Sequence, residues 1–179
     1  DAGQFLTTAL TIEMFVQRGG AVDTFYTCAS QFITQNNRAW RMFQNDNESW
    51  TMQLSSIGGP GESGTAKDAG VSLIPGNDYY IATVLEFGDF DGDGDAVDGR
   101  ATFYTKDLTA GTPLVVTPNV LWEDFGPMFD SSADFVIGGQ DEDNNSNKPF
   151  EGIIDEVRFS DTALSQSELL IVPEPSTFA

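Results

Sequence analysis

Apolar and polar residues alternate along most of this chain with a period of two, the spacing typical of half-buried β-strands. In residues 11–17 the apolar residues Ile12, Met14 and Val16 alternate with Glu13, Phe15 and Gln17. Comparable runs rich in Thr, Phe, Tyr, Trp and aliphatic residues predict further strands at residues 24–32, 38–44, 48–56, 79–87, 101–107, 112–116, 134–139 and 150–159.

A helical pattern occurs at residues 162–170, where Ser165 and Glu168 have the spacing of a capping box. Turn-forming residues separate strands elsewhere, as in Asn45-Asp46-Asn47 and the Gly/Pro/Ser-rich segment 57–64. Many short strands and almost no helix predict an all-β fold, a two-sheet antiparallel sandwich with one short helical turn near the C-terminus.

Composition narrows the choice of partners. The chain has 179 residues, with 28 acidic and 8 basic side chains and a net charge of −20. This charge argues against binding to nucleic acid or anionic membranes, since both require basic residues, and it favours divalent cations. No segment has the roughly 18 consecutive apolar residues of a membrane span, so none is predicted in this chain.

The chain contains no histidine and one cysteine, Cys28. These counts exclude a Ser-His-Asp triad, a Cys-His pair, an ordinary zinc site and an internal disulfide. Because Cys28 lies in a strand-like run, we expect a buried, unreactive thiol; a disulfide between subunits is the alternative.

The densest group of candidate ligands lies in residues 88–100. Five carboxylates alternate there with glycines: Asp89, Asp91, Asp93, Asp95 and Asp98. Crowded carboxylates in a Gly-rich turn can converge on one hard cation, which predicts a calcium site; a solvated acidic hairpin tip is the alternative. The start of this segment resembles an EF-type calcium loop, but Arg100 stands where that loop has its bidentate Glu.

Other candidates have a more ordinary structural alternative. Asp141 and Asp143, in residues 138–149, are further candidate calcium ligands, or belong to a polar surface loop. Trp40, Trp50 and Trp122 either stack on sugar rings or fill the core, with Trp122 expected to be the most exposed. The Glu-x-Asp-x-x-Glu spacing of some jellyroll glycosidases is absent, so we assign no catalytic residue and keep a glycoside hydrolase only as a remote alternative.

The segment FEGIIDEVRFSDTALSQSEL, residues 150–169, resembles the closing motif of the laminin-G-like, concanavalin-type jellyroll. The resemblance implies a jellyroll domain over residues 1–168, with Asp155 and Glu156 capping backbone donors or contacting a cation. Such domains usually begin one strand earlier than this chain does. We therefore expect a sheet edge that lacks its usual partner and can recruit another strand.

Residues 169–179 form a separate tail in this interpretation. It begins with four apolar residues that have no evident place in the core, Leu169, Leu170, Ile171 and Val172. The motif that follows resembles the start of a PEP-CTERM sorting signal: Val172, Pro173, Glu174, Pro175, Ser176 and Thr177. This resemblance implies a secreted or cell-surface protein of a Gram-negative bacterium.

Together these features predict a non-catalytic structural subunit of an extracellular filament or surface matrix. Copies would assemble head-to-tail, with the tail of one docking on a sheet edge of the next. The alternative is a calcium-dependent glycan-binding or adhesive module, whose partner is a polysaccharide.

Overall fold

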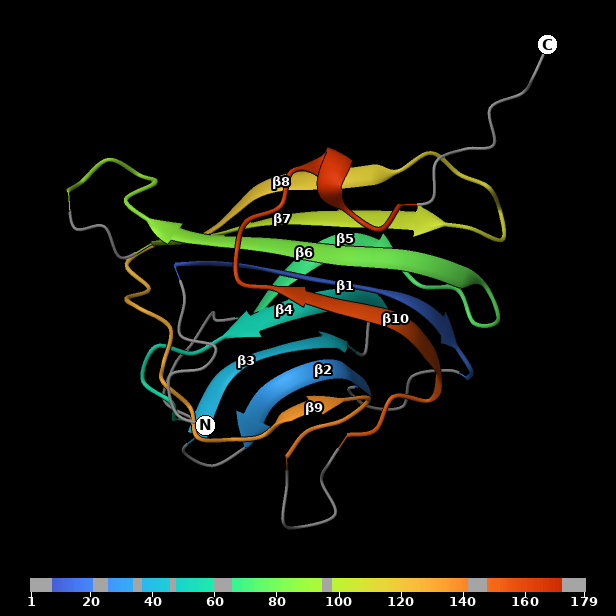
Figure 1. Cartoon of the computed structure of the whole chain (residues 1–179), viewed down its shortest axis with the longest axis horizontal. Coiled ribbons are helices and arrows are strands. Elements are labelled where there is room, and N and C mark those ends of the chain that lie inside the picture. The colour runs from blue at the N-terminus through green and yellow to red at the C-terminus, as the bar shows by residue number, and fades with distance from the viewer. Residues whose placement is uncertain are drawn as a thin grey trace.

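The computed structural model describes residues 8–20, 26–33, 37–45, 48–59, 66–94, 98–141 and 148–171. These residues form two five-stranded antiparallel sheets packed face to face (Figure 1). The first sheet has the order β10-β1-β6-β7-β8, with bounds Gly152–Ser160, Ala9–Arg18, Asp78–Gly88, Asp98–Asp107 and Val115–Trp122. The second has the order β5-β4-β3-β2-β9, with bounds Ala66–Ser72, Ser49–Leu54, Asn37–Gln44, Tyr26–Ile33 and Phe135–Ile137. The predicted all-β sandwich is confirmed.

β5 and β8 differ most from the sequence prediction, and β7 begins three residues before its predicted strand at 101–107. β5 was missed, and β8 begins three residues later than the predicted strand at 112–116 and extends to Trp122. The predicted helical turn is a single 3-10 turn at Gln166–Glu168, and the Glu168 carboxylate accepts hydrogen bonds from the Ser165 backbone N–H and hydroxyl at 2.9 and 2.7 Å. No helix in the described ranges is long and apolar enough to cross a membrane.

The main core lies between the two sheets. From β1 it receives the even-numbered residues Leu10, Ile12, Met14 and Val16, as their alternation predicts. All three tryptophans are buried in this core, and Trp122, which was expected to be the most exposed, is only 3% exposed. The Trp50 ring packs edge-on against Phe103, with 5.0 Å between ring centroids, and its Nε1 donates to Thr105 Oγ1 at 2.8 Å. Because they are buried, the tryptophans contribute to packing and present no stacking surface for a sugar.

Cys28 is also part of this core, and it is fully buried. Burial raises the pKa of its thiol to about 12. The expectation of a buried thiol is confirmed.

A second apolar cluster covers the outer face of the first sheet. The segment after β10, residues 161–171, crosses this face (Figure 1), and we call it the C-terminal strap. Leu169 of the strap is 7% exposed and packs with side chains of β6 and β7, namely Tyr80, Ala82, Val84 and Tyr104. Leu164, Leu170 and Ile171 pack against the same cluster.

The strap corrects one expectation from the sequence. Leu169, Leu170 and Ile171 were expected to have no place in their own domain, and instead they cover the outer side of its sheet. The prediction overlooked that β6 is apolar on both faces, so that its outer face needs a cover. Val172 and the sorting motif 172–177 lie outside the described residues.

A buried carboxylate anchors the strap. Glu13 of β1 is fully buried and forms a salt bridge with Arg158 of β10, whose side chain is 36% exposed. The same carboxylate accepts a hydrogen bond from the Tyr80 hydroxyl at 2.7 Å and from the Leu170 backbone N–H at 2.5 Å. Burial, and secondarily the Glu13 carboxylate, raise the pKa of Tyr80. Glu13 therefore links both neighbouring strands of β1 to the strap.

Candidate functional site

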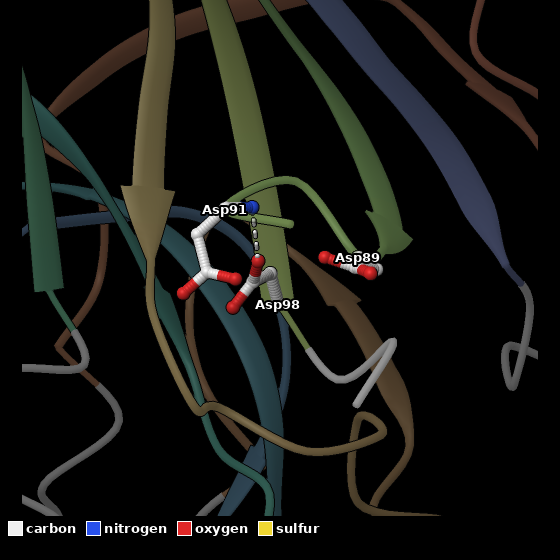
Figure 2. A group of neighbouring side chains, drawn as sticks. All are labelled: Asp89, Asp91 and Asp98. Atoms are coloured by element: carbon white, nitrogen blue, oxygen red, sulfur yellow. Dashed lines mark hydrogen bonds between the residues drawn. The ribbon is translucent and has the colours of Figure 1, made fainter. Parts of the chain in front are cut away.

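The acidic hairpin between β6 and β7 brings three of its five predicted ligands together. Each of Asp89, Asp91 and Asp98 offers a carboxylate oxygen, and these oxygens all lie within 4.8 Å of one another. Figure 2 shows Asp98 between the other two, at the start of β7. Asp93 does not belong to this group, and Asp95 lies outside the described residues.

Asp98 is buried and organises the surrounding backbone. Its Oδ2 accepts hydrogen bonds from the Phe90 and Asp91 N–H groups at 2.8 and 3.0 Å, and its Oδ1 accepts one from the Asp124 N–H at 3.1 Å. These donors, with Phe90 contributing most, lower the pKa of Asp98. The side chain therefore ties the hairpin to the turn after β8, which is a structural role in its own right.

Asp89 shapes the tip of the hairpin. Its two carboxylate oxygens accept hydrogen bonds from the Gly92 and Gly94 N–H groups at 2.6 and 3.1 Å. Both glycines have positive φ angles, +85° and +96°, a conformation that glycine adopts without steric cost. The alternation of Asp and Gly thus folds the loop back on its own carboxylates.

The neighbouring basic residue is engaged elsewhere. Arg100 forms a salt bridge with Glu86 at 2.9 Å, and its guanidinium lies 4.0 Å from the centroid of the Phe90 ring. Arg100, which stands where an EF-type loop has its Glu, therefore places a positively charged side chain beside the loop, and this side chain is already paired with Glu86.

The donor set fits a hard divalent cation. Three carboxylates converge, one buried and two exposed, and calcium is bound by such oxygen ligands. Asp98 Oδ2 already accepts two backbone hydrogen bonds, whereas Asp98 Oδ1 and the two Asp89 oxygens accept one each from the backbone and retain lone-pair capacity for an ion. Of the described residues, Asp89, Asp91 and Asp98 would hold the ion.

The second acidic loop shows no comparable convergence in its described part. The Asp141 carboxylate accepts a hydrogen bond from the Asp134 backbone N–H at 2.9 Å. Asp143 lies outside the described residues, so its prediction as a ligand stays untested.

No protein-family model matches this sequence, and no curated protein matches it. Solved structures share its fold. The CBM40 module of a Ruminococcus gnavus sialidase, bound to α2,3-sialyllactose, is 14% identical with a TM-score of 0.60, over 92% of this chain and 82% of that chain. A heptameric SAP-like pentraxin from Limulus polyphemus is 14% identical with a TM-score of 0.52, over 89% of this chain and 66% of that chain.

A Trypanosoma rangeli sialidase is also similar, at 14% identity and a TM-score of 0.53, over 92% of this chain but 22% of the sialidase. At identities this low the likeness shows the fold alone. The protein is an all-β jellyroll sandwich, as the closing motif at residues 150–169 implied.

Proposed function

We propose that this protein is a non-catalytic carbohydrate-binding module that uses a calcium ion held by Asp89, Asp91 and Asp98. The observation that carries the proposal is the convergence of these three carboxylates within 4.8 Å at one end of the sandwich. An ion there would leave coordination positions open to the hydroxyl oxygens of a sugar.

The fold supports the glycan-binding part of the proposal. The similar CBM40 module of a sialidase is bound to sialyllactose. The absence of a Glu-x-Asp-x-x-Glu motif from the sequence argues for binding rather than hydrolysis. The proposal carries with it the expectation of a secreted or cell-surface location.

A glycan array with and without a calcium chelator tests this function. The informative variant is Asp89→Asn/Asp91→Asn, which removes two exposed ligands and keeps Asp98 and its backbone contacts. Its matched control, Asp134→Asn/Glu151→Gln, removes the same charge from exposed sites elsewhere.

We expect calcium-dependent glycan binding by the wild type and the control, with calorimetry showing at least about tenfold weaker calcium binding by the double variant. Glycan binding that survives both the chelator and the double variant would remove calcium from the proposal. Silence of the wild type on the whole array would refute the binding function itself.

The filament-subunit hypothesis stays a prediction with less support. Its main reason was an apolar tail without a place in its own domain, and Leu169, Leu170 and Ile171 now have such a place. Comparing the sedimentation of the full chain with that of a chain ending at residue 171 tests it, because head-to-tail assembly through residues 172–179 requires the longer form to be larger.

A further inference from the structure

An open pocket of about 390 Å³ lies on the first sheet, at the opposite end of β6 and β7 from the acidic hairpin. Its apolar lining comes from β1, β10 and the turn after β7, through Phe15, Ile153 and Leu108. Three carboxylates line it as well, those of Asp78, Asp155 and Glu156. Both Ile153 and Leu108 are exposed, so this pocket is accessible from solvent.

An irregularity in β10 builds the acidic side of the pocket. Glu13 of β1 pairs with Arg158 and Phe15 pairs with Asp155, so two residues of β10 lie opposite one residue of β1. Such a bulge breaks the strict alternation of side chains along a strand. As a result Asp155 and Glu156, adjacent in sequence, both line the pocket.

Glu156 at this bulge has a φ angle of +48°, which is uncommon for a residue with a side chain. Local strain of this kind concentrates at functional sites, where it aims a side chain at a ligand. The Asp-Glu pair of the closing motif, which the calcium site does not use, therefore stands at a strained position beside the pocket.

The chemistry of the lining selects the ligand. The pocket combines an aromatic and aliphatic floor with three carboxylates, and neither Lys nor Arg is among its described lining residues. The Gln17 amide donates to Asp78 Oδ1 at 2.8 Å, and the Glu156 N–H donates to Asp155 Oδ1 at 2.9 Å, so these two acidic side chains are held in position. The group of described carboxylates that converges closely enough for a metal ion is the one in the β6–β7 hairpin, so a single ion is not the natural occupant here.

We propose that this pocket binds a sugar with a free amino group, such as a glucosamine unit of a polysaccharide; the proposal rests on the carbohydrate-binding function above. The C–H face of the sugar ring packs on Phe15, while its ammonium and hydroxyl groups donate to the carboxylates. The net charge of −20 attracts a cationic polymer and repels an anionic one. Sialic acid, bound by the similar CBM40 module, would meet three carboxylates at this pocket.

Isothermal titration tests the assignment with glucosamine oligomers, their N-acetylated counterparts and sialyllactose, at about pH 6 so that the amines are protonated. Two variants address the pocket: Asp155→Asn/Glu156→Gln removes charge, and Phe15→Leu removes the ring while keeping an apolar side chain. The matched control, Asp134→Asn/Glu123→Gln, removes the same charge from exposed positions outside the pocket.

We expect the wild type to bind glucosamine oligomers and the acidic double variant to bind them about tenfold more weakly, since each exposed charge pair contributes up to about fivefold. Phe15→Leu should weaken binding while thermal unfolding still shows a folded protein. The control should bind as the wild type does.

Unchanged binding of glucosamine oligomers by both pocket variants would overturn this inference and leave the carbohydrate-binding function intact. So would a preference for the N-acetylated or sialylated sugars. If the wild type bound no sugar and instead bound a Lys-rich peptide at this pocket, both proposals would fail.

Discussion

Replacing Arg158 with methionine tests whether the Glu13 anchor stabilises the fold. The change leaves a fully buried carboxylate without its cation, although the Tyr80 hydroxyl and the Leu170 N–H still donate to it. Breaking a fully buried ion pair costs about 3–5 kcal/mol. Because the Arg158 side chain is 36% exposed, water can partly replace it, and we expect a loss of about 2–3 kcal/mol in the free energy of unfolding.

Urea denaturation at neutral pH measures this loss. Arg100→Met is the matched control, because Arg100 pairs with Glu86 near the surface, where the two side chains are 30% and 36% exposed, and such pairs contribute about 1 kcal/mol or less. A double-mutant cycle with Glu13→Gln should show an interaction energy above about 1 kcal/mol between Glu13 and Arg158. Equal losses for Arg158→Met and Arg100→Met, or strict additivity in the cycle, would refute the anchor.

Three further predictions follow from burial and hydrogen bonding. The Phe90 N–H and two further backbone donors lower the pKa of Asp98, so the Asp98 carboxylate stabilises the fold above the ordinary aspartate pKa of about 3.9 and loses this effect as the pH falls through its lower folded-state pKa. The Asp98→Asn variant should therefore lose less stability than the wild type on acidification below about pH 4. Denaturation at a series of pH values measures this, and an unchanged pH profile would contradict it. The Cys28 thiol, with its pKa raised by burial to about 12, should react with a thiol reagent at about pH 8 only after unfolding, and rapid labelling of the folded protein would show that it is accessible. Leu169→Ala should lower the free energy of unfolding by about 2–3 kcal/mol, as for other buried leucines, whereas a near-zero change would mean that the strap is not part of the folded core.

Strands with a strong alternation of apolar and polar residues could be predicted from the sequence, and so could the edge strands β9 and β10. The edge strand β5 was missed, and the edge strand β8 was given the wrong bounds. β5 contains Lys67, Asp68 and Gly70, pairs with β4 alone among the described strands, and has one buried residue, so it carries little apolar signal. β8 contains Pro118 and Asn119, the latter with a φ angle of +56°. An edge strand tolerates proline because one side of its backbone needs no partner. Proline usually indicates the end of a strand, so Pro118 led to a prediction that ended before it.

The site was predictable in composition but not in geometry. The sequence shows five clustered carboxylates, yet it does not show that Asp98 is buried and bonded to three backbone N–H groups while Asp89 and Asp91 are exposed. The bulge that places Asp155 and Glu156 on one side depends on pairing with β1, which lies far away in the chain. These features arise from tertiary contacts that no local pattern encodes.

One signal of the strap was nevertheless present in the sequence. Residues 79–87 are almost uniformly apolar, which is typical of a strand covered on both faces. The outer residues Tyr80, Ala82 and Val84 required a cover, and the apolar residues 169–171 supply it.

The pairing of β1 with β10 has a consequence for how the chain matures. β1 acquires one of its two strand partners from residues 152–160, and its outer side is covered by residues 161–171. Contacts this distant in sequence form slowly, because the intervening loop must close first. Until residues 152–171 have been synthesised, β1 lacks one of its strand partners and its outer cover, which leaves an interval in which a chaperone can still engage the chain.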